Sequence, residues 1–476
     1  MIHIISTGGE CEKFVSKYAL SILMQDYPKE KYMVHIFEDY CKDNTGALLD
    51  QYFSGIQNVF ITHSKEKFWG GKALHTLMSS DKIKNDDIVC IVDLDDWLPD
   101  KDVLKRVESY YTKNPHILFT FGDYMVFDGE EKTYRSINKM PKTIKGIRKE
   151  NFTTTHLKTW KHKIYKRIRI QDLKDKNGNF FRACQDAAIV YPMLEMAGIN
   201  KILFTKDINY IYNRANPLNE DKVTNLQISS IKEISEKPTY CNNLIYYTSF
   251  GEKYATLTNI SIETLIDKGR YRGEIIVICD DYFEKNNANN VKTVNVQNEI
   301  GNLHPCFARI MFAHKINANQ YEQIMYLDSD IEVLKDINPM FIAKDKIVYT
   351  NEVFTHSQLP FKGLCCSSAF TMDEYLKYGS KLLVNAGSYC VDAKLFYSFI
   401  REWKKIMSDY KLTFGIDQST LNLLIYRGSL KTEAWDKNII NFDHSIPQSI
   451  FNTKEGIIKH YLEDTKENMI LKHKKV

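Results

Sequence analysis

One short pattern occurs twice in this chain of 476 residues, and it constrains the fold more than any other feature. An apolar run in "IVDLDDWL" leads directly into Asp93, Asp95 and Asp96, and a second run in "IMYLDSDI" leads into Asp328 and Asp330. Neighbouring carboxylates repel one another, and holding them beside a buried strand costs free energy unless a positive charge offsets the repulsion. Each cluster therefore indicates a cation-binding site at the end of a buried strand.

Each acidic cluster stands at the end of a similar series of predicted strands and helices. Apolar runs typical of strands alternate with stretches typical of helices, which we expect at 11–25, 71–80, 255–268 and 305–318. The polar, proline-containing stretch 227–241 suits a domain junction. We therefore predict an α/β protein with two domains in tandem, 1–235 and 236–476, each a mostly parallel sheet with helices on both faces. In such sheets ligands bind beyond the carboxyl ends of the strands, which is where both clusters should lie.

Composition excludes several classes of protein. The 64 basic and 60 acidic residues are interspersed, so nothing requires a nucleic-acid partner. The sequence shows neither a signal peptide nor an apolar window long enough to span a membrane, and we expect no transmembrane segment. The ten cysteines lack zinc spacing and a disulfide framework, which predicts reduced thiols and a cytoplasmic location.

The acidic clusters allow several interpretations. Paired carboxylates at a strand end can hold Mn²⁺ or Mg²⁺ through oxygen ligands, and such an ion can bridge a diphosphate leaving group. An EF-hand would need a glycine that neither stretch supplies, and a phosphatase motif would need a small residue where Trp97 and Glu332 stand. A solvated turn with capping aspartates would explain one cluster better than two at the same depth. A nucleotidyltransferase, which also uses paired carboxylates and a metal, remains open on these residues alone.

The first half resembles the family 2 glycosyltransferases, which have the GT-A fold. The resemblance rests on "HIFEDYCKDNTG", "FWGGKALHTLM", "VDLDDWL" and "CQDAAIVYPMLEMAG". It implies that Asp186 is the catalytic base of an inverting transfer, although Gln185 stands where that family usually has glutamate. It further implies a donor site and a metal site, with Glu38, Asp39, Lys72 and Asp93 in the former and Asp95 and Asp96 in the latter.

The second half resembles the family 8 glycosyltransferases, a retaining family with the same fold. The motifs that carry this resemblance are "FGEKYATLTNISIETL", "CFARIMFAHKI", "YLDSDIEVLKDI", "LLVNAGSYCVD", "GIDQSTLNLL" and "IKHYLEDTKEN". The resemblance implies that Asp417 and Gln418 face the donor sugar and that Asp328, Asp330 and His460 bind the metal. It implies further donor and acceptor contacts from Tyr254, Arg309, Asn385, Gly387 and Lys466.

Together the two resemblances predict a bifunctional glycosyltransferase. Each domain would use Mn²⁺ or Mg²⁺ and a nucleotide sugar, UDP-linked, to extend a glycan or glycoconjugate acceptor. The alternative is that only the second domain is catalytic. The first, with Gln185 in its base motif, would then be a module that positions the acceptor or has a structural role. The nucleotidyltransferase interpretation leaves the His460 and Lys466 motif without a role.

Overall fold

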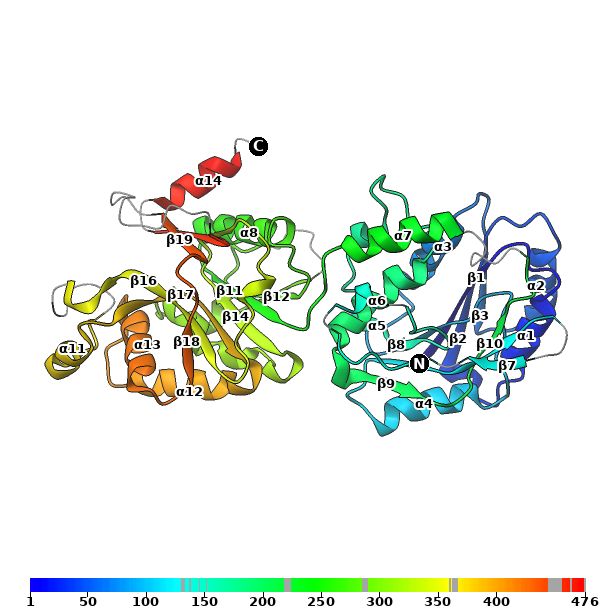
Figure 1. Ribbon diagram of the computed structural model, residues 1–476, viewed down its shortest axis with the longest axis horizontal. Helices are drawn as coiled ribbons and strands as arrows, with labels where there is room; N and C mark the ends of the chain where they lie inside the picture. The colour runs from blue at the N-terminus through cyan, green and yellow to red at the C-terminus, as the bar shows by residue number, and fades with distance from the viewer. Residues whose placement is uncertain are drawn as a thin grey trace. The chain divides into compact units, whose positions relative to one another are not determined.

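The chain forms two compact units, Met1–Pro238 and Thr239–Val476 (Figure 1). This computed structural model describes residues 1–129, 133–136, 138–144, 146–150, 152–217, 224–284, 290–358, 361, 367–443, 456–462 and 465–474. Within these residues, no helix combines the length and the apolar character needed to cross a membrane.

A seven-stranded sheet forms the centre of the first unit, in the order β3-β2-β1-β4-β8-β5-β9. Only β8 among these strands runs antiparallel to its neighbours. The strands are Ile2–Gly8 (β1), Tyr32–Glu38 (β2), Val59–His63 (β3), Ile88–Ile91 (β4), Phe119–Gly122 (β5), Thr159–Lys161 (β8) and Ile202–Thr205 (β9). A smaller sheet contains Tyr124–Phe127 (β6), Thr133–Ser136 (β7) and Ile211–Asn213 (β10). The helices are Val15–Leu23 (α1), Thr45–Phe53 (α2), Trp69–Met78 (α3), Val103–Lys113 (α4), His162–Tyr165 (α5), Gln185–Ala197 (α6) and Thr224–Glu236 (α7).

The main sheet of the second unit repeats the connectivity of the main sheet of the first. Its main sheet has the order β13-β12-β11-β14-β17-β16-β18, and β17 is antiparallel to both neighbours. The strands are Leu244–Ser249 (β11), Glu274–Cys279 (β12), Val291–Asn295 (β13), Gln323–Leu327 (β14), Ile347–Thr355 (β16), Leu382–Asp392 (β17) and Thr432–Ala434 (β18). A smaller sheet contains Ile331–Val333 (β15), Ile440–Asp443 (β19) and Ile458–Tyr461 (β20). The helices are Glu252–Asp267 (α8), Gln297–Ile300 (α9), Ala308–Met311 (α10), Met372–Tyr378 (α11), Phe396–Met407 (α12), Ile416–Arg427 (α13) and Lys466–Lys474 (α14).

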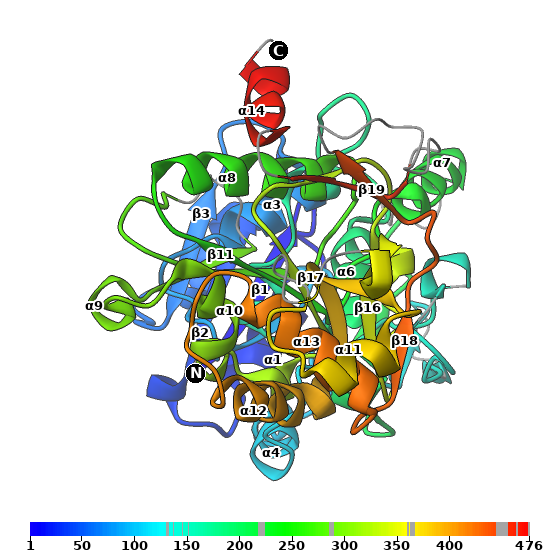
Figure 2. The same ribbon diagram turned by 90° about the vertical axis from the view of Figure 1, so that its left-hand side faces the viewer.

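Helices cover both faces of the second sheet. Along β11, Tyr246 belongs to the core beneath α12 and α13, whereas its neighbour Tyr247 belongs to the core beneath α8, as alternation along a strand requires. Both views show α8 and α12 on opposite sides of the strands (Figures 1 and 2). Helix α12 presents Phe399 and Trp403, four positions apart, to the sheet, and each fully buried aromatic side chain stabilises the unit by roughly 1.5–3 kcal/mol. The predicted fold class, two mostly parallel α/β sheets in tandem, is confirmed.

One predicted helix is wrong in its extent. Residues 305–318 do not form a single helix but a short helix, α10, between 3₁₀ turns at Pro305–Phe307 and Ala313–Lys315. The amide of Lys315 bonds to the carbonyl of Phe312, three residues back, so the α-helical ladder is lost there. Of the ten cysteines, the eight that lie among the described residues are free thiols, and Cys365 and Cys366 lie outside them.

Two candidate active sites

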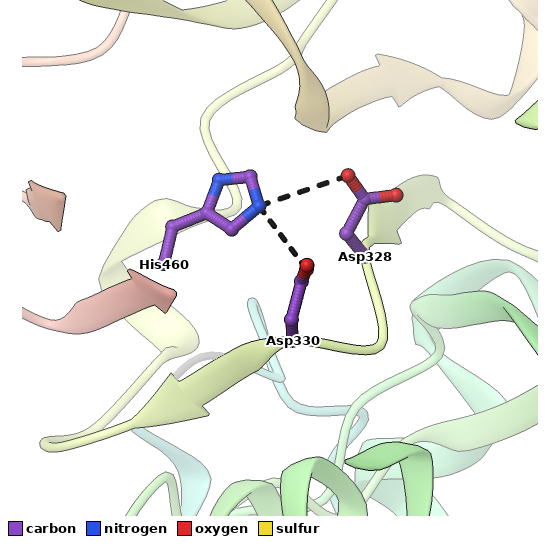
Figure 3. Close-up of side chains that lie close together, drawn as sticks. All are labelled: Asp328, Asp330 and His460. Carbon is purple, nitrogen blue, oxygen red and sulfur yellow. Dashed lines mark hydrogen bonds and ion pairs between the residues drawn. The ribbon is translucent and has the colours of Figure 1, made fainter. Parts of the chain in front are cut away.

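Three potential metal ligands meet at the end of β14 in the second unit (Figure 3). Asp328 follows β14 directly, Asp330 precedes β15, and His460 lies in β20, where it pairs with Ile331 across the small sheet. The Nε2 atom of His460 lies 3.1 Å from Oδ1 of Asp330 and 3.8 Å from Oδ2 of Asp328. Among the described residues, this is the one group of three such side chains whose ligand atoms all lie within 4.8 Å of one another.

Opposite charges compensate for the burial of this cluster. Burial works against the ionised form of Asp330, but ion pairs with His460 and with Lys466, whose Nζ lies 2.8 Å from Oδ2, hold its pKa well below the usual range. Burial likewise works against the charged form of His460, but Asp330 and Asp328 raise its pKa. The Nδ1 atom of His460 is buried and has no hydrogen-bond partner among the described residues.

Gly387 leaves space for this cluster. A Cβ atom added there would lie 2.5 Å from Cε1 of His460 and 2.6 Å from Oδ2 of Asp328. The backbone at the same residue fixes the loop, because the amide of Asp328 donates to the carbonyl of Gly387 at 2.8 Å. Only glycine therefore lets β17 pass so close to the ligand atoms.

We expect Gly387→Ala to lower Mn²⁺ affinity at least about tenfold while the unit still folds, because separations under 3 Å force the ligand side chains to shift. Titration with Mn²⁺ and a thermal unfolding curve would check both parts. Gly379→Ala is the matched control, since its added methyl group meets nothing closer than the carbonyl oxygen of Tyr375 at 3.2 Å. Equal Mn²⁺ affinity in the two variants would contradict the expectation.

An arginine links the cluster to the N-terminus of α13. Arg309, in α10, is buried; its guanidinium donates to Oδ1 of Asp328 at 3.1 Å and pairs closely with the carboxylate of Asp417. The hydroxyl of Tyr326 also donates to Oδ1 of Asp328 at 2.6 Å. The carboxylate of Asp417 is thus held by its guanidinium partner.

A carboxylate that the sequence analysis missed lies beside the remaining polar residues. Glu352, in β16, accepts hydrogen bonds from Nδ2 of Asn385 at 3.0 Å and from Nε2 of Gln418 at 3.3 Å. The backbone amide of Ala386 donates to Oε1 of Gln418 at 3.2 Å. A charged residue inside the strand-forming run "IVYTNEVFT" was the available signal for Glu352.

Tyr254 and Lys466 approach each other on the α8 side of the cluster. The Nζ atom of Lys466 lies 3.5 Å from the Tyr254 hydroxyl, and the tyrosine side chain is 40% exposed.

Asp280, at the end of β12, accepts from the amides of Gly251 and Tyr282, and the acidic ending of "GEIIVICDD" was the sequence signal for it. The amide of Gly387 donates to Oδ1 of Asn385 at 2.8 Å, so a chain of contacts connects all ten residues predicted for the second site.

A pocket of about 780 Å³ marks the corresponding region of the first unit. It lies where β1, β2 and β4 end and where α3 and α6 begin. Of the seven residues predicted for this site, five line the pocket: Asp39, Asp93, Asp95, Asp96 and Asp186. Glu38 and Lys72 do not, because Glu38 accepts from the amide of Cys41 and pairs with His63, and Lys72 pairs with Glu66 and lies over the ring of Phe68.

Hydrogen bonds hold Asp95 and Asp96 after β4. Asp96 is buried and accepts from the Tyr210 hydroxyl at 2.6 Å and from the amide of Asn213 at 2.7 Å. Burial, together with Asp95 and Asp93, raises the pKa of Asp96 well above its usual value, and burial also raises the pKa of Asp95. A cation in this pocket would favour the ionised form of both side chains.

Asp186 lies in the first turn of α6, with 37% of its side chain exposed. Its Oδ2 atom lies 3.4 Å from Nζ of Lys158, a buried lysine that also lines the pocket and was missed by the sequence analysis. Gln185 packs against the start of α3 instead, where a Cβ atom on Gly70 would lie 2.7 Å from Nε2 of the glutamine. Gln185 lines the pocket too, so both side chains reach it, but only Asp186 offers a carboxylate.

Asp39 organises the loop before α3. Its carboxylate accepts from the amides of Phe68 at 2.6 Å and Trp69 at 2.8 Å, and Nζ of Lys67 lies 3.6 Å away. Lys67 and Trp69 line the pocket as well, and the guanidinium of Arg182 lies 3.6 Å from the centre of the Trp69 ring. Lys67 was not predicted, since a lysine in a loop carries no distinctive pattern, and Trp69 is the first residue of α3.

A protein-family model matches much of the first unit. Residues 3–174 match the family model described as "Glycosyl transferase family 2", so a glycosyltransferase domain is confirmed in this part of the chain. No protein of curated function matches the chain. The resemblance of the second half to family 8 stays a prediction.

Solved structures of glycosyltransferases are similar to parts of the chain. Residues 1–349 of S. aureus TarS in complex with UDP share 16% identity, with 44% of this chain and 60% of that chain covered and a TM-score of 0.35. The galactosyltransferase LgtC in complex with donor and acceptor sugar analogs shares 15% identity, with 49% and 96% covered and a TM-score of 0.36. The mannosyltransferase PcManGT from Pyrobaculum calidifontis, in complex with GDP-Man and Mn²⁺, shares 14% identity, with 46% and 58% covered and a TM-score of 0.31.

Proposed function

We propose that the chain is a bifunctional glycosyltransferase with one active site in each domain, 1–235 and 236–476. Each site would transfer a sugar from a nucleotide-sugar donor, UDP-linked, to a glycan or glycoconjugate acceptor. The observation that carries the proposal is the cluster of Asp328, Asp330 and His460 beside Lys466. A divalent cation held by these ligands and the ammonium group of Lys466 would both lie close to a bound nucleoside diphosphate. Together they would offset its negative charge.

The residues of the second cluster fit a divalent cation. Two carboxylates and an imidazole are a donor set for Mn²⁺, and for Mg²⁺ through the carboxylates, and Gly387 keeps the space between them clear. In the first unit Asp95 and Asp96 are the residues that would hold such an ion, beside Asp93. When bound, the metal acts as a Lewis acid that stabilises the departing diphosphate.

In the second site the chain's own residues would bind and orient the donor. Lys466 supplies a positive charge for the diphosphate, and the half-exposed ring of Tyr254 offers a face for the base. Asn385 and Gln418, held by Glu352, present amide groups toward the donor sugar. Because Asp417 is paired with Arg309, an acid-plus-base pair is lacking among the residues assigned to this site, which favours retention of the anomeric configuration.

In the first site Asp186 would act as a general base. An inverting transfer needs a group that accepts the acceptor proton while the hydroxyl attacks opposite the leaving diphosphate. The carboxylate is partly exposed to the pocket and held by Lys158. Asp39, at the end of β2, would lie near the nucleoside.

A second candidate function is that only the second unit transfers sugar. Gln185 in place of the usual glutamate favours it. So does the finding that, among the described residues, the aspartates after β4 do not form a three-ligand group. The first unit would then position the acceptor.

A donor screen with the full chain tests the proposal. We expect release of UDP, dependent on Mn²⁺ or Mg²⁺, from at least one nucleotide sugar in a panel. With each site inactivated in turn, an α-linked donor should give a β-linkage from the first site and an α-linkage from the second, which proton NMR coupling constants distinguish. Release of pyrophosphate would instead support a nucleotidyltransferase, and loss of all transfer on inactivating the second site alone would support the second candidate.

A further inference from the structure

Glu332 has no role in the proposed transfer, yet its side chain is completely buried. It lies in β15, two residues after Asp330. Asp330 stands in the turn just before this strand, so the two carboxylates are close neighbours in the chain. A buried carboxylate is costly unless it is paired and hydrogen-bonded.

Two of the four partners of Glu332 come from the C-terminal helix α14. The Nζ atom of Lys472 lies 2.8 Å from both carboxylate oxygens, and Nε2 of His473 lies 3.5 Å from Oε1. The hydroxyl of Tyr461, in β20, donates to Oε2 at 2.8 Å, and Nζ of Lys268, directly after α8, lies 3.0 Å from Oε1. The carboxylate therefore joins β15 to the last turn of α14.

The first residue of α14 is Lys466, which pairs with Asp330. Lys466 and Lys472 lie about 9 Å apart along a helix that rises 1.5 Å per residue. One helix nevertheless carries both lysines, with Lys466 on Asp330 and Lys472 on Glu332.

Helix α14 also contacts α8, through an ion pair between Glu467 and Lys253 and through apolar side chains. Met469 and Ile470 form a small apolar cluster with Leu257 and Ile260 of α8 and with Tyr461. The helix has nine residues, and helices of this length are marginal in water without tertiary contacts. Its order therefore depends on these apolar contacts and on the ion pairs at its two ends.

We propose that α14 is a latch on the second active site, and that Glu332 is the positioning residue that holds the latch closed and keeps Lys466 at the diphosphate. The inference rests on the proposed function of that site. The contacts between Glu332 and α14 use none of the metal-ligand atoms. They would therefore keep α14, and with it Lys466, at the site when the carboxylate of Asp330 binds the metal. A lysine on an unanchored chain end would first have to be ordered, which weakens binding.

The test uses Lys472→Met in the full chain, because half of this side chain is exposed and its replacement leaves the core intact. We expect hydrogen exchange of the α14 amides to become at least about tenfold faster and UDP affinity in the presence of Mn²⁺ to fall by about the same factor. Lys466→Met should lower UDP affinity similarly, and the double variant should lose no more than Lys466→Met alone. Lys472→Arg should restore both properties, and Lys405→Met, on the exposed side of α12, should change neither.

Unchanged exchange in Lys472→Met would overturn the latch, and so would additive losses of UDP affinity in the double variant. If the wild-type chain binds no UDP, the proposed function of the site fails. The exchange data then still decide the anchor, because the contacts of Glu332 exist without any ligand. Glu332→Gln should reproduce the faster exchange of α14 while the amides of β14 and β17 stay protected.

Discussion

Replacing Asp328 and Asp330 together with asparagine is expected to abolish metal-dependent UDP binding at the second site. The substitution keeps the shape of both side chains but removes the two negative charges of a three-ligand set, leaving His460 as the sole unchanged ligand. Calorimetric titration of the full chain with UDP and Mn²⁺ should show the stoichiometry reduced by one site. Transfer by the second site should fall below detection.

The double variant Asp373→Asn with Asp409→Asn is the matched control. Both aspartates are exposed in the same unit, so the control makes the same change in net charge away from the cluster. It should keep the wild-type stoichiometry. Unchanged stoichiometry and unchanged metal dependence in the Asp328 and Asp330 variant would show that the cluster does not bind the metal.

Asp186→Asn is expected to slow transfer by the first site about a hundredfold or more, the usual effect of losing a positioned base. That factor corresponds to about 2.7 kcal/mol of transition-state stabilisation. The loss should appear in kcat rather than in donor binding, because the nucleoside contact proposed for Asp39 and the metal contact proposed for Asp95 are unchanged. The assay should use a chain whose second site is inactive, so that all transfer comes from the first.

Asp81→Asn, an exposed aspartate of the same unit, is the control and should keep full activity. If Asp186→Asn also keeps full kcat, another group is the base. If the wild-type first site shows no transfer at all with the second site inactive, the first unit is a positioning module, and the candidate function favoured by Gln185 is correct.

Much of the fold could be predicted because its signals are local. The strands before Asp93 and Asp328 are runs of apolar residues, and a run that is buried on both faces is typical of a parallel strand whatever lies elsewhere in the chain. The prediction of a single helix at 305–318 is wrong, and the reason is again local. Its composition suits a helix, but the chain there turns at Pro305 and again after Phe312.

The second site depends on contacts between distant residues. His460 reaches Asp330 because β20 pairs with β15 across 130 positions of sequence, and the sequence indicated it only through a family resemblance. Glu352 carries no motif, and it meets Asn385 and Gln418 because β16, β17 and α13 pack together. Lys158 reaches Asp186 in the same way, across 28 positions.

Glu332 shows most clearly the difference between what the sequence determines and what the tertiary structure decides. In the sequence it only excluded a phosphatase motif, whereas in the structure it is a buried carboxylate that holds the C-terminal helix. By itself the sequence determined the two α/β sheets and the acidic turns that follow their central strands, because apolar periodicity and neighbouring charges are properties of a short window. Only the tertiary structure decided which distant side chains complete each site, because strand register and helix docking follow from the free energy of the whole packed unit.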